Sequence, residues 1–190
     1  MRTFMTAFSV AAIFSASASA AEDFTIDPTH SVVQFSVDRF GFNKVLGQVP
    51  IIDGVVALDD EAPEKSAVQV KVNLAGLTSG DATRDDHVKG PLWFNVDKFA
   101  LASFASTAVR PTGADAAEVD GLLSLHGAKA PVTLTVKLNK RGLDPATRKE
   151  AAGFSATARL KRSDFGMTTA LGMVGDDVTI TIEALAHRSE

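Results

Sequence analysis

The chain has 190 residues, a net charge of −4 and no cysteine, which suits one domain with a sizeable core. This mild acidity argues against nucleic acid as a partner, because phosphates require clustered Lys and Arg. The lack of cysteine excludes disulfides, thiol catalysis and cysteine-ligated zinc, so stability must come from packing and hydrogen bonding.

The start of the chain has the pattern of a secretory signal peptide. Arg2 precedes an apolar segment at 4–14, and Ala18-Ser19-Ala20 supplies a small-residue cleavage site. A membrane-spanning helix would need roughly twenty apolar residues, and this segment is shorter. We expect cleavage after Ala20, which leaves one domain at 21–190 located in the periplasm.

Alternation of apolar and polar residues dominates the rest of the chain. A period of two predicts strands that have one buried face and one exposed face. The predicted strands fall at 33–37, 52–58, 68–74, 101–109, 119–125, 132–138, 154–160 and 178–182, of which 101–109 and 119–125 are the weaker two. Only 80–94 lacks alternation, and there Asp81 can cap a short helix that runs through Arg84 and His87.

Eight one-sided strands bury their apolar faces most simply by closing into a barrel, which also removes exposed edges. The predicted fold is therefore all-β: an eight-stranded antiparallel barrel with one short helical insertion. The inward rows include small residues that fill little of a lumen, namely Gly54, Ala105, Gly121, Ala156, Ala158 and Ala184. These favour a ligand cavity, with a packed sandwich as the alternative.

The residues that alternate with these inward ones form the outer face, and their polarity decides whether such a barrel would span a membrane. They carry Lys71, Asp120, Lys137, Arg159, Lys161 and Glu183. A membrane barrel needs an apolar outer face, and Lys or Arg near the bilayer midplane costs about 2–4 kcal/mol each. We therefore expect a barrel that does not span a membrane.

The densest polar cluster is Arg84-Asp85-Asp86-His87. It has two interpretations: acid–base or metal chemistry on a small substrate, with help from His30 or His126, or a brace that holds the helix to the barrel. The sequence has no H-x-x-x-H pattern, nucleophile elbow or Gly-rich nucleotide motif in a fitting context. The bracing role is therefore favoured, and no catalytic residue, metal or cofactor is expected.

A second polar group follows the strand at 154–160. Arg162 and Asp164 offer a charge pair beside Phe165. Such a pair can tie the mouth of a barrel closed or bind the polar end of a ligand. His30 precedes the first strand and His126 precedes Gly127 at a turn, so both are interpreted as structural.

Several short motifs, taken in order along the chain, resemble the YceI family. They are Asp27-Pro28-Thr29-His30-Ser31, Arg84-Asp85-Asp86-His87 followed by Trp93-Phe94-Asn95-Val96, Leu125-His126-Gly127, and Arg162-Ser163-Asp164-Phe165-Gly166-Met167. Each motif is weak alone, and together they span nearly all of 21–190. The resemblance implies a lipocalin-like barrel with an elongated apolar lumen. It also implies isoprenoid chains, such as quinone tails, or other long-chain lipids as ligands.

The function predicted from these observations is non-enzymatic binding or carriage of a long-chain apolar ligand. The large groups expected to line the lumen or its mouth are Phe35, Trp93, Phe104, Phe154 and Phe165, and Phe40 and Phe42 are expected to form a lid. The alternative is a small-substrate or metal-dependent enzyme that uses Arg84, Asp85 and His87. The sequence leaves open whether the protein is a homodimer.

Overall fold

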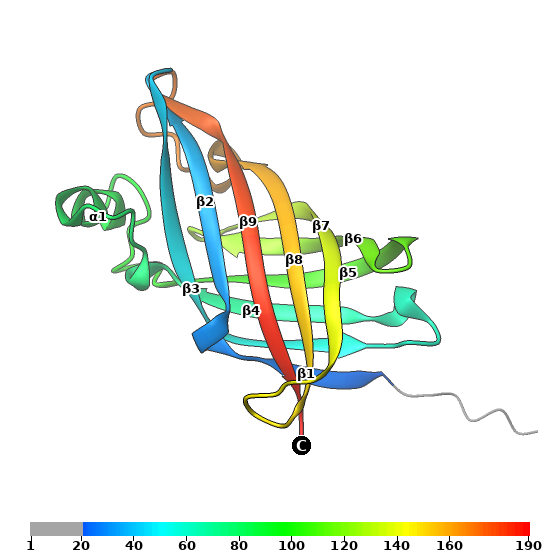
Figure 1. Ribbon diagram of the computed structural model, residues 1–190. Coiled ribbons are helices and arrows are strands. Elements are labelled where there is room, and N and C mark those ends of the chain that lie inside the picture. Colours follow the sequence, from blue (N-terminus) through cyan, green and yellow to red (C-terminus); the bar gives the residue numbers. More distant parts are fainter. Residues whose placement is uncertain (1–20) are drawn as a thin grey trace, which may run out of the picture.

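The computed structural model describes residues 21–190, so the predicted signal peptide and its cleavage site lie outside the described residues. This part of the chain is built almost entirely from β-strands, with one α-helix (Figure 1). In chain order the elements are β1 (Glu22–Ile26), β2 (Val32–Arg39), β3 (Asn43–Leu58), β4 (Ala67–Asn73), α1 (Ala82–Lys89), β5 (Leu101–Gly113), β6 (Ala116–Leu125), β7 (Ala128–Leu143), β8 (Glu150–Lys161) and β9 (Val174–Arg188). No helix within 21–190 is long and apolar enough to cross a membrane.

The strands close into a barrel in which every neighbouring pair is antiparallel. The order is β3-β2-β9-β8-β7-β6-β5-β4, and β4 pairs back onto β3. β1 pairs with β3 and β9, which are also the two neighbours of β2. Because β1 and β2 share these neighbours, they form two halves of one interrupted strand. The predicted eight-stranded antiparallel barrel with one short helix is therefore confirmed.

The interruption between β1 and β2 is a 3-10 turn at Pro28–His30. Asp27 caps this turn, because its carboxylate accepts hydrogen bonds from the Thr29 N–H (2.8 Å) and hydroxyl (2.6 Å) and lies 2.8 Å from Nδ1 of His30. The Thr29 and His30 side chains lower the pKa of Asp27 to about 2. His30 therefore has a structural contact, as the sequence predicted, but its ring bonds to the side chains of Asp27 and Thr29 within the turn and not to the main chain of the strand.

Two residues that the sequence pattern places on the inward face, Ile52 and Ala105, are exposed instead. Ile51 is buried at 2% exposure, whereas Ile52, placed inside by the sequence pattern, is 42% exposed. A register shift between Ile51 and Asp53 causes the difference, because an extra residue in one strand reverses which side chains face inward. Ala105 is also exposed, and it lies opposite the outward-facing Leu122.

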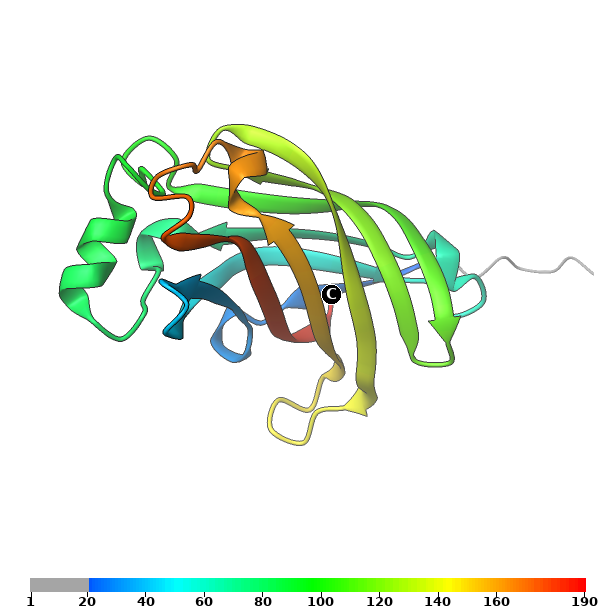
Figure 2. The same cartoon turned by 90° about the horizontal axis from the view of Figure 1, so that it is seen from above.

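The helix α1 lies at one end of the barrel, outside the strands (Figure 2). Its N-cap is Asp81, whose carboxylate accepts from the Arg84 N–H at 2.8 Å, as the sequence predicted. The segment that follows packs Phe94 and Val96 against the buried residues Leu74, Leu77 and others. The helix and this segment therefore cover one end of the lumen.

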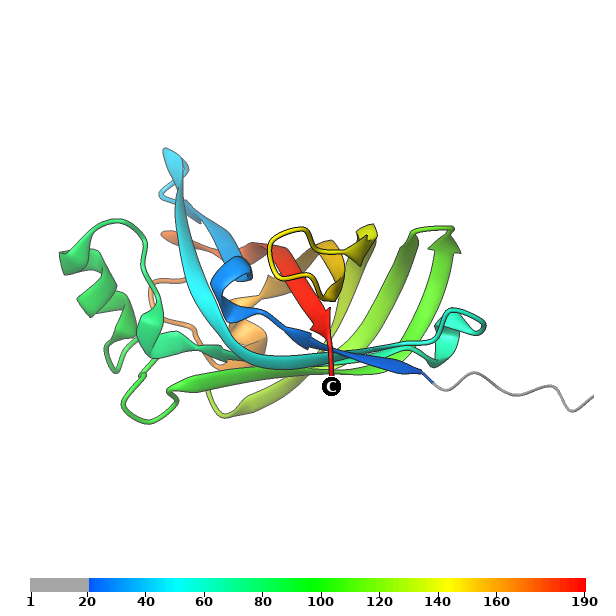
Figure 3. The same cartoon turned by 60° about the horizontal axis from the view of Figure 1, so that its bottom comes forward.

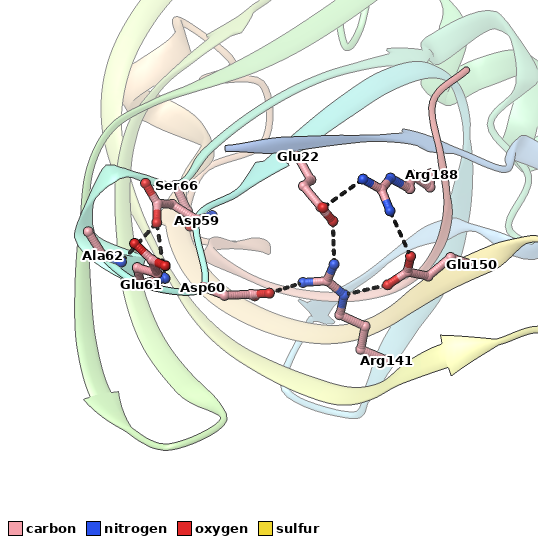
Figure 4. Close-up of polar contacts among 9 residues, drawn as sticks. All are labelled: Glu22, Asp59, Asp60, Glu61, Ala62, Ser66, Arg141, Glu150 and Arg188. Atoms are coloured by element: carbon pink, nitrogen blue, oxygen red, sulfur yellow. Dashed lines mark hydrogen bonds and ion pairs between the residues drawn. The ribbon is translucent and has the colours of Figure 1, made fainter. Parts of the chain in front are cut away.

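The other side of the barrel carries a network of ion pairs around Arg141 of β7 (Figure 4). Its guanidinium contacts Asp60 (2.5 Å), Glu150 (3.0 Å) and Glu22, and its carbon lies 5.0 Å from the centre of the buried Phe24 ring. Because Asp60 belongs to the β3–β4 connection, the network links that turn to β1, β7 and β8. This part of the barrel is closed by Phe24 and the Arg141 network.

Asp144 makes the acid stability of the barrel testable. Its carboxylate lies 2.9 Å from Nε2 of His187 and accepts from Ala146 N and the Thr147 hydroxyl. These hydrogen bonds lower the pKa of Asp144 from 3.8 to about 2, and the bond with His187 makes the largest contribution. Because the pKa of Asp144 is lower in the folded state than in the unfolded state, its ionised carboxylate stabilises the fold above about pH 4. This stabilisation is lost as the pH falls toward about 2.

Replacing Asp144 with Asn should therefore lower the Tm at neutral pH. It should also make the fall of Tm between pH of about 4 and 2 shallower than in the wild type. Thermal melts followed by circular dichroism across this range would check both effects. A variant whose acid profile parallels that of the wild type would show that other carboxylates dominate acid unfolding.

Candidate functional site

A cavity of about 710 Å³ runs inside the barrel. This volume lies within the usual range for small-molecule sites of about 300–1,000 Å³. The wall is predominantly aliphatic and aromatic, with side chains from β2 to β9 and from the α1 segment. Such a wall offers dispersion contacts and few hydrogen-bond partners, which suits an apolar ligand.

The cavity is elongated along the strands. On β9 its lining begins at Val174 and reaches Ala184, a span of roughly 33 Å at 3.3 Å per residue along the strand. The intervening lining residues of β9 are Val178, Ile180 and Ile182. A cavity of this shape fits an extended chain better than a compact molecule.

Two glycines let aromatic rings lie against the wall instead of across the lumen. A Cβ at Gly47 would lie 2.2 Å from Cζ of Phe35, and one at Gly121 would lie 2.3 Å from Cζ of Phe104. Gly54 is similarly covered by Ile26 and Val70. The space above these glycines is therefore filled by neighbouring side chains. Of the small inward residues chosen from the sequence, the alanines of β8 and β9 border the cavity.

Replacing Gly47 with Ala should push the Phe35 ring off the wall. The displaced ring would enter the lumen, so bound apolar ligand should fall, with a loss of stability of about 1–3 kcal/mol from overpacking. Adding Phe35→Leu to this variant should recover part of both properties, because the shorter side chain leaves room for the new methyl group but gives up the aromatic contact of Phe35. Ligand titrations and urea melts of the single and double variants would measure this coupling; additive effects would contradict it.

The aromatic residues chosen from the sequence divide into two groups. Those that line the cavity are Phe35, Phe40, Trp93, Phe104 and Phe154. Phe165 does not line it: the ring is 1% exposed and packs with Met167 and Val132. Phe42 also lies outside the lining and is 87% exposed, so of the two predicted lid residues only Phe40 borders the cavity.

Arg84 and Asp85 meet at Ser79, a polar residue of the cavity lining. The buried Asp85 carboxylate accepts from the Ser79 hydroxyl (2.5 Å) and N–H (2.7 Å). Nε and Nη2 of Arg84 donate to the Ser79 hydroxyl (2.7 Å) and carbonyl (2.8 Å). The Ser79 hydroxyl, and then its N–H, lower the pKa of Asp85 while burial raises it. This arrangement attaches α1 to the segment before it, whose Thr78 pairs with Gln48 of β3.

His87 and Arg162 both lie beside Trp93 at the cavity wall. The His87 ring meets Trp93 edge-on, with centroids 6.3 Å apart, and the Arg162 guanidinium lies 5.5 Å above the indole. No hydrogen bond joins His87 to Asp85 within residues 21–190, and no His, Asp and Glu side chains there gather into a group that could hold a metal ion. The predicted cluster is therefore divided: Arg84 and Asp85 meet at Ser79, whereas His87 makes an edge-on ring contact with Trp93.

Arg162 is 4% exposed and donates only to main-chain carbonyls. Its acceptors are Gly175 (2.9 Å), Met167 (2.6 Å), Thr169 (2.8 Å) and Val174 (2.9 Å). Burial lowers the pKa of this guanidinium, and the nearby Asp176 opposes the shift, so the group stays protonated at neutral pH. Arg162 thus holds the β8–β9 connection against the barrel.

The predicted pairing of Arg162 with Asp164 is wrong. Asp164 is exposed, whereas Asp176 of β9 accepts from the Ser163 N–H (2.9 Å) and hydroxyl (2.8 Å). The cause is the 3-10 turn at Arg162–Phe165, which buries residues 162 and 165 and leaves 164 outside. Sequence reasoning also missed Ser79, for which no motif gives a signal, and Arg39, a cavity-lining residue.

Both the sequence and the fold resemble those of known proteins. The family model described as a YceI-like domain matches residues 24–186. The chain belongs to the YceI family. Among its relatives are UPF0312 proteins of Enterobacter sp. (strain 638), 34% identical over 93% of both chains, and of Serratia proteamaculans (strain 568), 35% identical over 95% of this YceI-family chain and 94% of the relative.

Three solved structures share the fold. BcnA of Burkholderia cenocepacia superimposes with a TM-score of 0.75 at 24% identity, covering 85% of this chain and 99% of BcnA. The Campylobacter jejuni YceI protein has a TM-score of 0.63 at 18% identity, with both chains fully covered. A polyisoprenoid binding domain from Saccharophagus degradans has a TM-score of 0.61 at 14% identity, covering 90% of this chain and all of that domain. At these identities the likeness establishes the barrel fold.

Proposed function

We propose that this YceI-family protein binds or carries a long-chain apolar ligand, such as a polyisoprenoid, a quinone or another lipid, without chemically changing it. The observation that carries the proposal is the elongated apolar cavity of about 710 Å³. The solved neighbour described as a polyisoprenoid binding domain supports the same ligand class.

The driving force for such binding is the removal of apolar surface from water. Each buried CH₂ contributes about 0.8 kcal/mol, so a chain that fills the lumen needs no strong polar contact. Phe35, Trp93, Phe104 and Phe154 add large flat surfaces to the aliphatic wall. We propose these four residues, with Phe40 at the β2–β3 turn, as the main aromatic contacts of the ligand.

The proposed location is the periplasm. The basic start, short apolar segment and Ala18-Ser19-Ala20 site support export with cleavage after Ala20. A water-filled compartment between membranes is also where a lipid would need a shielded cavity.

Organic extraction of the purified protein tests the ligand proposal. The protein should be purified from osmotic-shock fluid, and its extract should contain one long-chain lipid class by mass spectrometry, at close to one molecule per protein chain. Metal content is measured on the same preparation. A stoichiometric metal without lipid would favour the alternative, an enzyme built on Arg84, Asp85 and His87, and would contradict the carrier function.

A further inference from the structure

The charged residues that line the cavity are separated by sign between its two ends. The cations are Arg39, Arg84 and Arg162, and the carboxylates are Asp59, Asp60 and Asp115. The arginines belong to α1, the end of β2 and the start of the β8–β9 connection, whereas the carboxylates belong to the β3–β4 and β5–β6 turns. In Figures 1 and 3 α1 lies at one end of the molecule and these two turns lie at the other.

The three segments at the cationic end are joined by hydrogen bonds. The Phe40 N–H of the β2–β3 turn donates to the Met173 carbonyl of the β8–β9 connection at 2.7 Å. The Thr169 hydroxyl of that connection donates to the Leu92 carbonyl, beside Trp93, at 2.5 Å. The cationic residues therefore surround one connected rim of the cavity.

The three arginines of this rim have no carboxylate within 4.0 Å among residues 21–190, in contrast to Arg110, Arg141 and Arg188 elsewhere on the barrel. Arg162 is also more than nine-tenths buried, and all of its hydrogen bonds go to main-chain carbonyls, while Asp176 acts on it only from beyond ion-pair distance. A buried cation is costly unless an opposite charge approaches it. An anion held at this rim would supply that charge.

Arg84 is already oriented for such a partner. Its Nε and Nη2 are fixed by Ser79, which Asp85 holds in turn, and Nη1 has no acceptor among the described residues. A guanidinium fixed in advance loses little side-chain entropy when it binds an oxyanion. The free amino group thus offers a preorganised donor at the cavity wall.

We propose that the ligand is a single-chain amphiphile with an anionic head, a carboxylate or a phosphate monoester. Its chain occupies the lumen and its head lies at the rim formed by Arg39, Arg84 and Arg162. The reverse orientation would bring the head to the three aspartates. Asp60 is paired with Arg141, but Asp59 and Asp115 have no ion pair among the described residues, so like charges repel the head there. This inference rests on the proposed lipid-binding function and adds the chemistry of the head and its direction in the barrel.

The test uses four probes with the same chain: myristate, myristyl phosphate, myristyl alcohol and myristylamine. Binding to delipidated full-length mature protein is measured by calorimetry at neutral pH and low salt. We expect at least one of the two anions to bind about tenfold more tightly than the alcohol, as a hydrogen bond to a charged group predicts, and the amine to bind no better than the alcohol. Comparing the two anions separates carboxylate from phosphate recognition.

Variants then locate the preference. Arg39→Gln combined with Arg84→Gln should remove most of the advantage of the anion over the alcohol, and this advantage is the ratio of the two affinities measured on the same variant. Arg159→Gln, an exposed outward residue of β8, makes a matched change of charge and should have no effect. Arg39→Gln alone alters an exposed side chain at a turn, so it should fold normally and lower the affinity for the anion about threefold.

The outcomes separate this inference from the proposed function. If the alcohol binds as tightly as both anions, the anionic head is refuted and the lipid-binding function stands. If the double variant keeps the full advantage of the anion while it melts like the wild type, the assignment of the rim is refuted. If none of the four probes binds, both proposals fail.

Discussion

Replacing Arg162 with Met should destabilise the protein by about 3–5 kcal/mol. The guanidinium is the buried donor for four main-chain carbonyls, those of Gly175, Met167, Thr169 and Val174. A buried carbonyl without a donor costs about 1–3 kcal/mol. Because the β8–β9 connection should relax and let water reach some of the four carbonyls, the total loss is smaller than four such costs. Such a loss is a large part of the stability of about 5–15 kcal/mol that is usual for a domain.

Urea unfolding of Arg162→Met and two companions measures this contribution. Arg159→Met removes an exposed arginine from β8, three residues before Arg162, and should change stability by no more than about 0.5 kcal/mol. Arg162→Lys keeps the charge but lacks the fork of five donors, so its loss should be intermediate. Equal midpoints for Arg162→Met and Arg159→Met would show that the carbonyls are hydrated and that Arg162 does not hold the connection.

Much of the barrel could be predicted because its strands bury one face each. Alternation of side chains places residues such as Val33, Phe35 and Val37 on one side without any knowledge of neighbours. The phase errors at Ile52 and Ala105 have a different origin. The register shift in β3 at Ile51–Asp53 depends on how β3 pairs with β4, and pairing between strands is absent from local sequence.

The candidate site shows the same limit at the level of single contacts. Proximity in sequence suggested Asp164 as the partner of Arg162, but the 3-10 turn directs Asp164 to solvent. The carboxylate that accepts hydrogen bonds from this turn, at Ser163, is that of Asp176, across the β8–β9 connection. The role of Ser79 could not be predicted from the sequence either, since it depends on Arg84 and Asp85 bonding to the same hydroxyl. Both contacts depend on how a turn or helix folds back on a neighbouring segment, which the order of residues alone does not show.

The lumen itself can be tested with Ala156→Phe. Ala156 of β8 is 7% exposed, borders the cavity, and lies between Val136 of β7 and Ile182 of β9, which also border it. If the lumen is hollow, the new ring occupies space that a ligand chain would use. The variant should then retain much less lipid than the wild type and melt at nearly the same temperature.

The matched control is Thr157→Phe, which adds the same ring at the next residue, on the exposed outer face of β8. It should retain lipid like the wild type and change stability by no more than about 0.5 kcal/mol. A lumen already filled by side chains would respond to Ala156→Phe in the opposite way: overpacking would remove about 1–3 kcal/mol of stability, while lipid retention would match that of Thr157→Phe. Lipid content and melting curves from the same preparations separate these cases, because a ring inside the barrel must displace either ligand or protein.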